Sequence, residues 1–330
     1  MTKITTDWAV GDTGAQVAAK LTAIHDYYFG ADARSGDTVI GDISGRLTPL
    51  LSGASIPAIS CGELMLTVGP KLNALNDPDA FILSALLPGS TALVAAMPSP
   101  ETCFTDTART TPATVGQAVA GITDPSGYGL HPTQAVVASR PILRQAGTGE
   151  YYLEFDGVDD FLVTPTITPG TDKMQLFVGL RKISDAAGAI VVEYGPDVNT
   201  TSGVFALVYP RSASINEPLF ISNGTLQTLS GNAATTFPAP RTDVLTTLAD
   251  IGAPFARQRV NGVQRVDATK TQGTGNFGAY PAYIGMRAGT IAPFNGHIYS
   301  LILRFGPNLS DAQIAATERY VAARTAGVTL

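Results

Sequence analysis

The chain has few cysteines, few histidines and few charged side chains. Two cysteines and three histidines occur in 330 residues, which is too few for a disulfide framework or a four-ligand zinc cage. Charged residues make up 15% of the chain, and 21 basic against 27 acidic residues give a net charge of −6. Because no basic surplus exists to neutralise phosphates, we expect no nucleic-acid binding.

Long hydrophobic runs are also missing. Residues 80–100 carry no charge, but prolines and glycine divide them into Phe81–Leu87 and Ala92–Met97. Both pieces are far shorter than the ~20 residues that cross a bilayer, so we expect no membrane insertion. The first eight residues lack the apolar run of ~7–15 residues of a secretory signal, so we do not expect export by that route.

Glycine and proline are abundant instead, and they separate short β-type runs. The 34 glycines and 22 prolines predict many turns. Asn261-Gly262 favours a type I′ hairpin turn, and Asn223-Gly224 repeats the signal. The candidate strands are rich in β-branched and aromatic residues, several with alternating polarity: Tyr151–Phe155, Asp160–Thr164, Met174–Leu180, Ala189–Tyr194, Val204–Tyr209, Leu219–Ser222, Val244–Ile251, Phe255–Val260, Val263–Val266, Ala282–Met286 and Ile298–Phe305.

The order of these runs predicts the fold class. No alternation of strands with helices and no repeat period accompanies them, which favours a mainly β protein with an antiparallel β-sandwich of jelly-roll type. We expect this domain over residues 88–330. Ser310 and Gln313 have capping-box spacing, so a closing helix is expected to start there, end at Gly327 and lie against the sandwich.

A smaller helical segment is expected to precede the sandwich, over residues 1–87. Thr13 and Gln16 have capping-box spacing, Gly30 suits a helix end, and a second helix is predicted around Gly62–Leu75. A helix with one apolar stripe needs a partner, either the rest of the chain or another chain. The stripe consists of Val17, Leu21, Ile24 and Tyr28.

Several stretches resemble a known family. Tyr152–Phe161 (Tyr-Leu-Glu-Phe-Asp-Gly-Val-Asp-Asp-Phe) resembles the Phe-Asp-Gly-x-x-Asp element of concanavalin A-like, laminin G-like jelly rolls. Gly296–Ile302 with Leu309–Val321 is similar to the last strand and closing helix of those domains. Residues 104–141 resemble the lead-in of tailed-phage fibre, collar and spike proteins and of gene transfer agents, although no tryptophan stands near its start. Trp8–Leu21 resembles the N-terminal segment of phage tail and fibre proteins.

The resemblance implies a non-enzymatic virion protein, a fibre or head spike. The N-terminal region, with Trp8 and the apolar stripe, would attach to other virion proteins, and the jelly roll would bind host-surface polysaccharide as receptor. The resemblance further implies a homo-oligomer, with a trimer favoured, made in the bacterial cytoplasm and carried on the particle surface. Two alternatives are a glycan-degrading enzyme on the same fold and a purely structural connector or decoration protein.

The carboxylates around Glu154 decide against the enzyme. Retaining glucanases of this fold carry Glu-x-Asp-x-x-Glu on one strand, and Glu154-Phe-Asp156 begins that pattern. Gly157 then breaks the strand, and the third carboxylate, Asp159, has the opposite parity and a shorter side chain. We therefore expect a structural turn and no catalysis.

Three aspartates of the same element could hold a cation. Asp156, Asp159 and Asp160 place three oxygen donors within five residues, but Ca²⁺ takes six to eight ligands. Asx-turn and capping roles are the competing interpretation. No cofactor is expected, and Ca²⁺ is left open for these three residues.

Aromatic residues near predicted strand ends are the candidates for sugar stacking, since sugars offer apolar C–H faces to rings. The alternative is that such rings are lids of the core. Tyr128, Tyr209, Tyr280 and Phe294 are the candidates for glycan binding, with Tyr194 and Phe277 in similar positions. His131 and His297 are expected to make structural hydrogen bonds.

Overall fold

The computed structural model describes residues 78–231 and 236–330. Gly89–Leu330 form one compact unit, and helix α4 (Pro78–Leu86) belongs to a different unit. None of the helices in the described ranges is long and apolar enough to span a membrane. The predictions for Trp8, the apolar stripe and the helix at residues 62–75 lie outside the described residues.

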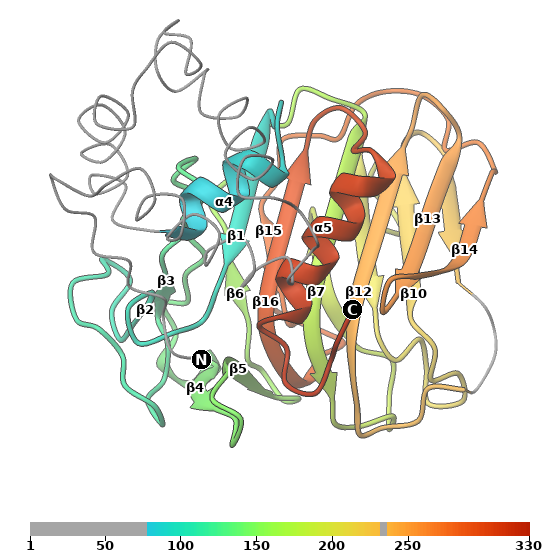
Figure 1. The fold of residues 1–330 in the computed structure, drawn as a ribbon. Helices are drawn as coiled ribbons and strands as arrows, with labels where there is room; N and C mark the ends of the chain where they lie inside the picture. The colour runs from blue at the N-terminus through green and yellow to red at the C-terminus, as the bar shows by residue number, and fades with distance from the viewer. Residues whose placement is uncertain (1–77, 232–235) are drawn as a thin grey trace, which may run out of the picture. The chain divides into compact units, whose positions relative to one another are not determined.

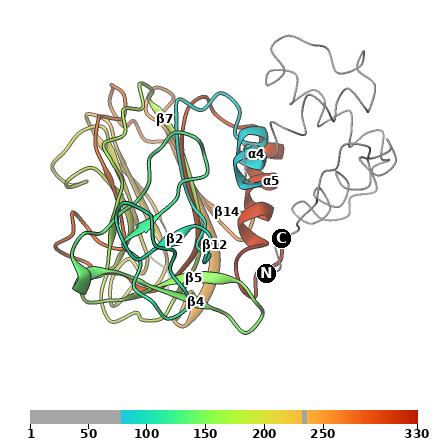
Figure 2. The same cartoon turned by 90° about the vertical axis from the view of Figure 1, so that its left-hand side faces the viewer.

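Two antiparallel sheets face each other (Figures 1 and 2). Sheet A has the order β14-β13-β12-β7-β16-β5-β4, with β1 also paired to β16, and sheet B has the order β11-β10-β9-β8-β15-β6. The strands of sheet A are β1 (Ala92–Ala96), β4 (Ile142–Gln145), β5 (Tyr151–Asp156), β7 (Lys173–Lys182), β12 (Arg241–Asp250), β13 (Phe255–Val260), β14 (Val263–Ala268) and β16 (Asn295–Phe305). Those of sheet B are β6 (Leu162–Val163), β8 (Ile190–Tyr194), β9 (Val204–Val208), β10 (Leu219–Asn223), β11 (Gln227–Ser230) and β15 (Ala282–Ile284). A separate pair joins β2 (Cys103–Phe104) to β3 (Gly121–Ile122), and one short 3₁₀ helix, η3, spans Val137–Ser139.

The core lies between the two sheets. Alternate residues of β7, among them Leu176 and Val178, face it from sheet A, and Phe205 and Leu207 of β9 face it from sheet B. This alternation is what buries one side of each strand while the other side stays on an outer face. The expected fold class, a mainly β antiparallel sandwich, is confirmed.

All eleven predicted strands are present, with bounds that differ by a few residues. Asn261 and Gly262 have φ values of 48° and 75°, as the predicted type I′ turn between β13 and β14 requires. The Asn223-Gly224 expectation is wrong in detail, since neither residue has a positive φ and residues 224–226 link β10 to β11. The Asn223 amide instead donates to the carbonyl oxygens of Val198 and Thr201.

Helix α5 (Asp311–Ala322) lies across sheet A, over β7 and β12, as predicted (Figure 1). Ser310 and Gln313 form the predicted capping box. The predicted end is wrong: the helix ends at Ala322, and Gly327 turns the chain only later, with a φ of 77°. A Cβ atom on Gly179 would lie 2.0 Å from the Thr325 hydroxyl. The absence of a side chain at Gly179 therefore lets the segment after α5 pack closely onto β7.

Strand β14 is an edge of sheet A and contains a β-bulge. Gln258 of β13 pairs with Val266, and Arg259 pairs with Gln264. Arg265 is therefore an extra residue with no partner in the ladder. Such a residue bends the edge strand and interrupts its row of hydrogen-bonding groups.

Candidate functional site

The Phe-Asp-Gly element forms a tight turn at the end of β5. Strand β5 ends at Asp156, and Gly157 follows with a φ of 78°. The Asp156 Oδ1 atom accepts hydrogen bonds from the backbone N–H groups of Val158, at 2.8 Å, and Asp159, at 3.4 Å. These bonds form the Asx turn that the sequence suggests.

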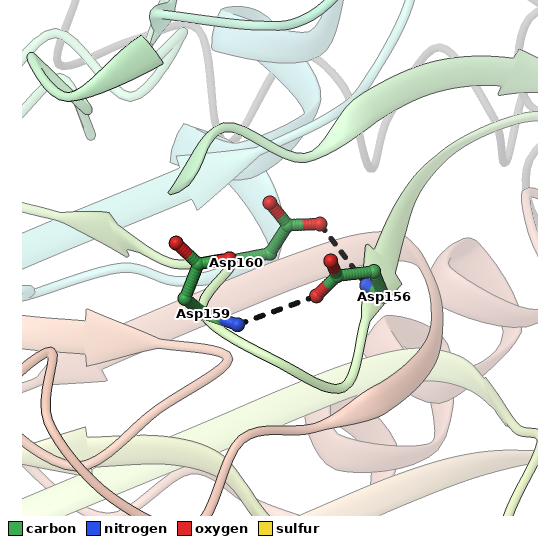
Figure 3. A group of neighbouring side chains, drawn as sticks. All are labelled: Asp156, Asp159 and Asp160. Atoms are coloured by element: carbon green, nitrogen blue, oxygen red, sulfur yellow. Dashed lines mark hydrogen bonds between the residues drawn. The ribbon is translucent and has the colours of Figure 1, made fainter. Parts of the chain in front are cut away.

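The turn brings Asp156, Asp159 and Asp160 together (Figure 3), and we call these three residues the acidic turn. One carboxylate oxygen from each lies within 4.8 Å of the others. Asp160 is only 5% exposed, and its Oδ2 atom accepts the Asp156 backbone N–H at 3.0 Å. Burial, reinforced by the charges of Asp156 and Asp159, raises the pKa of Asp160 to about 6.

The acidic turn supplies only part of a Ca²⁺ site. Each carboxylate already uses one oxygen within the fold: Asp156 and Asp160 accept backbone N–H groups, and Asp159 accepts the Ser139 hydroxyl at 2.8 Å. The second oxygen of each remains, which gives three ligands where Ca²⁺ takes six to eight. A cation here would take most of its remaining ligands from water.

A second group of side chains lies on the outer face of sheet A. Tyr152 of β5 and His297 and Tyr299 of β16 form a cluster that we call the aromatic strip. The Tyr152 and His297 rings stack with centroids 4.1 Å apart, and the Tyr299 centroid is 5.2 Å from that of Tyr152. Their strand neighbours Leu153 and Ile298 face the core, so alternation directs the rings away from it. Tyr152 and His297 are half-buried there, but Tyr299 is only 4% exposed.

Charged side chains flank the aromatic strip. On β4 and β5, Arg144 Nε lies 2.5 Å from Glu154 Oε2, and on β7 Arg181 stands opposite His297 in the sheet register. Within the described residues, the buried Arg181 Nε and His297 Nδ1 atoms have no hydrogen-bond partner. Burial lowers the pKa of His297 to about 4, so its imidazole is neutral near neutral pH.

His131 and His297, the histidines within the described residues, behave differently from each other. His131 makes the predicted structural hydrogen bond, because its Nδ1 atom accepts the Asp124 backbone N–H at 2.9 Å. The prediction of a structural hydrogen bond for His297 is wrong within the described residues, since its buried Nδ1 atom has no hydrogen-bond partner and its ring stacks on Tyr152.

The glucanase-like carboxylates do not lie along one strand. Glu154 is on β5 and pairs with Arg144, whereas Asp159 lies in the turn beyond the strand end. The Asp159 carboxylate accepts the Ser139 hydroxyl. Gly157 thus separates the third carboxylate from the strand, as the sequence suggests.

Two of the four predicted glycan-binding residues are core residues. Tyr209 and Phe294 are 0% and 1% exposed, and the Tyr209 hydroxyl donates to Asp243 Oδ2 at 2.7 Å. A ring that solvent does not reach cannot stack on a sugar, so the assignment of these two is corrected. Tyr128 is 44% exposed and its hydroxyl donates to the Ser90 carbonyl, while Tyr280 is partly buried against the core. Tyr194 and Phe277 are also buried.

Sequence reasoning missed the aromatic strip. The signal was present, because Tyr152 and Glu154 share one parity on β5, and His297 and Tyr299 share one parity on β16. What local sequence does not contain is the pairing of His297 with Glu154 across the sheet. That pairing joins segments separated by more than half of the sandwich domain.

Comparison with known proteins gives only distant structural likeness. No protein-family model and no curated protein matches this chain. Solved structures similar to it include a botulinum neurotoxin DC binding domain in complex with SialylT, at 12% identity and a TM-score of 0.47, over 61% of this chain and 48% of that chain. A botulinum neurotoxin serotype G binding domain matches at 11% identity and 0.46, over 59% and 47%. NanB plus Optactamide matches at 14% and 0.37, over 44% and 23%.

This chain spans about half the length of the neurotoxin chains that it matches, with 48% of the first covered. Identities this low carry no information on function, because many functions share one fold.

Proposed function

We propose that this protein is a non-enzymatic virion protein, a fibre or spike of a tailed phage or gene transfer agent, whose sandwich binds host-surface polysaccharide. The N-terminal region would attach it to other virion proteins. The single observation that supports glycan binding is the aromatic strip with its charged neighbours on the outer face of sheet A.

The strip combines the two kinds of contact that a sugar uses. The half-buried rings of Tyr152 and His297 can pack on apolar C–H faces, whereas Tyr299, at 4% exposure, only backs the Tyr152 ring. Sugar hydroxyl groups take hydrogen bonds from charged or amide side chains. Arg181 stands opposite His297 in the sheet register, and its buried Nε atom has no hydrogen-bond partner within the described residues. One such site binds weakly, and several copies on one particle raise the overall affinity through multivalency.

The carboxylates favour binding without hydrolysis. Retaining glycosidases need two carboxyl groups ~5–5.5 Å apart across the scissile bond. Glu154 pairs with Arg144, and the carboxylates of the acidic turn each hold the turn together through one oxygen. Neither arrangement presents a nucleophile and an acid on one strand.

A binding assay tests this proposal. The full chain and its Tyr152→Ala/His297→Ala variant are compared on a printed array of bacterial polysaccharides and on whole cells of candidate hosts. We expect the variant to lose about tenfold or more in affinity, because aromatic contacts dominate such sites. Tyr283→Ala, a half-buried tyrosine on the outer face of sheet B, is the matched control and should bind normally.

Unchanged binding by the Tyr152→Ala/His297→Ala variant would contradict the assignment of the strip. The virion role is tested separately by mass spectrometry of purified particles. Presence in the particle without any adsorption of the protein to cells or glycans would favour the structural connector.

A further inference from the structure

Three strongly exposed valines lie beside the acidic turn. Val136, Val137 and Val158 are 58%, 69% and 70% exposed. Val136 and Val137 stand at the start of η3, and Val158 is the tip of the turn after β5. Single exposed valines are ordinary, but three on two hydrogen-bonded segments, beside uncompensated carboxylates, are a feature that a partner could cover.

Hydrogen bonds hold these two segments together. The Ser139 hydroxyl donates to Asp159 Oδ2 at 2.8 Å, and the Phe161 N–H donates to the Ser139 carbonyl at 3.1 Å. The Gln134 amide donates to the Phe161 carbonyl at 3.1 Å. The valines are therefore presented on a fixed support, and a partner that binds them orders little additional chain.

The support itself is stiff at Gly157. This residue has a φ of 78°, and a Cβ atom added to it would lie 2.6 Å from the Cβ atom of Asn295. The Val158 N–H is fixed by the Asp156 carboxylate. Val158 is thus held outward by the backbone and not by packing of its own side chain.

The negative charge beside the valines is not neutralised within the described residues. In residues 78–231 and 236–330, no lysine or arginine forms an ion pair with Asp156, Asp159 or Asp160. Arg140 is near in sequence, but its guanidinium donates to the carbonyl oxygens of Thr105, Gln134 and Ala135.

We propose that Val136, Val137 and Val158, together with the acidic turn, form a docking surface for a segment of another protein that carries lysine or arginine between apolar side chains. The apolar side chains cover the valines, and the cationic group meets the carboxylates. Charge complementarity selects this occupant, because the same carboxylates repel an anionic lipid surface. The residues of this surface differ from those of the aromatic strip, although both include residues of β5.

Labelled peptides test the proposal with the full chain. The probe is fluorescein-Gly-Leu-Lys-Leu-Lys-Leu-Gly, and the comparison peptides replace both lysines by glutamate or all leucines by serine. We expect saturable binding of the first peptide, at least about tenfold weaker binding of the other two, and weakening by 0.5 M NaCl as ion pairs are screened.

Two double variants locate the site. Val137→Ser/Val158→Ser and Asp156→Asn/Asp159→Asn should each weaken peptide binding about tenfold, since the first removes apolar contact and the second removes charge. Val263→Ser, a 60% exposed valine at the β13–β14 hairpin, is the matched control and should bind as the natural chain does. Thermal melting of each variant verifies that it is folded.

Three results would overturn the proposal. They are no saturable binding of the leucine-lysine peptide, equal binding of the glutamate peptide, and undiminished binding by either double variant. Tighter binding to phosphatidylcholine vesicles with 30% phosphatidylserine than to the peptide would also overturn it, in favour of a membrane surface. Because these variants leave Tyr152 and His297 unchanged, failure here leaves the glycan assay to be judged by itself.

Discussion

Two aspartate-led turns of the sandwich use their carboxylates in opposite ways. In the Asp124-Pro-Ser-Gly turn, one carboxylate accepts four hydrogen bonds, from the backbone N–H groups of Ala95, Ser126 and Leu130 and from the Ser126 hydroxyl. In the acidic turn, three carboxylates share a few donors, and each keeps one oxygen without a partner among the described residues.

This difference distinguishes Asp124, whose carboxylate has a structural role, from the aspartates of the acidic turn, whose remaining oxygens are available to a ligand. Asp124 is 4% exposed and fastens its loop to β1 through the Ala95 N–H at 2.9 Å. All its acceptor capacity is used, so no capacity remains for a ligand. The acidic turn holds its own shape with half of its oxygens, and the other half can meet a cation or a cationic side chain.

The largest effect is expected from Asp124→Ala. The change leaves several buried donors unsatisfied, which costs about 3 kcal/mol in free energy of unfolding. The melting temperature should fall by roughly 6–12 °C for a domain of this size, as measured by calorimetry. Asp106→Ala is the control, because the Asp106 carboxylate also accepts hydrogen bonds from three donors, the Thr110 N–H and hydroxyl and the Thr111 N–H, but these residues are exposed. An equal loss for both variants would show that burial does not decide the effect and that the number of hydrogen bonds alone sets it.

An intermediate effect is expected from Asp160→Asn. The pKa of Asp160 is about 6 in the folded protein and near 3.8 in the unfolded chain, so the folded state holds this proton between those pH values. The natural chain therefore loses stability as the pH rises from about 4 to 6. Asparagine keeps the acceptor for the Asp156 N–H and removes the charge. We expect a gain of about 1 kcal/mol at pH 7.5, or roughly 2–4 °C in melting temperature.

This gain should shrink towards zero near pH 4, where the Asp160 carboxyl is protonated in the folded protein. Melting curves of both chains at pH 4, 6 and 7.5 measure it. A gain that is the same at all three pH values would refute the link between the raised pKa and stability.

The smallest effect is expected from Ca²⁺. With three uncommitted carboxylate oxygens, the acidic turn should bind this ion no more tightly than about 1 mM, which adds about 0.4 kcal/mol at 1 mM CaCl₂. The melting temperature should rise by less than about 2 °C over an EDTA control. A rise of several degrees that disappears in Asp159→Asn would establish a Ca²⁺ site. The carboxylates of the acidic turn would then be metal ligands, and their contrast with Asp124 as uncommitted groups would no longer hold.

Local signals predicted much of the fold. The type I′ turn at Asn261-Gly262 and the capping box at Ser310 depend on a few neighbouring residues, and both are present. Two strands that were missed depend on their partners, one distant and one adjacent in the sequence. Alanine-rich β1 is a strand because it pairs with β16, residue Ala92 opposite Phe305, and polar β11 because it pairs with β10.

The candidate sites also differ in whether local sequence or strand pairing determines them. The acidic turn was predictable because its three aspartates lie within five residues. Tyr209 and Phe294 were assigned wrongly because a position near a strand end does not tell which face of the sandwich a ring meets. The aromatic strip needs the β5–β16 pairing, which brings Glu154 opposite His297.

The bulge at Arg265 has a consequence for crowded copies of this domain. A regular edge strand can serve as a template on which a neighbouring chain extends the sheet, which leads to aggregation. With Arg265 outside the ladder, β14 offers a bent and interrupted row of donors and acceptors. At high local concentration, β14 is therefore a poorer template for sheet extension between copies than a flat edge would be.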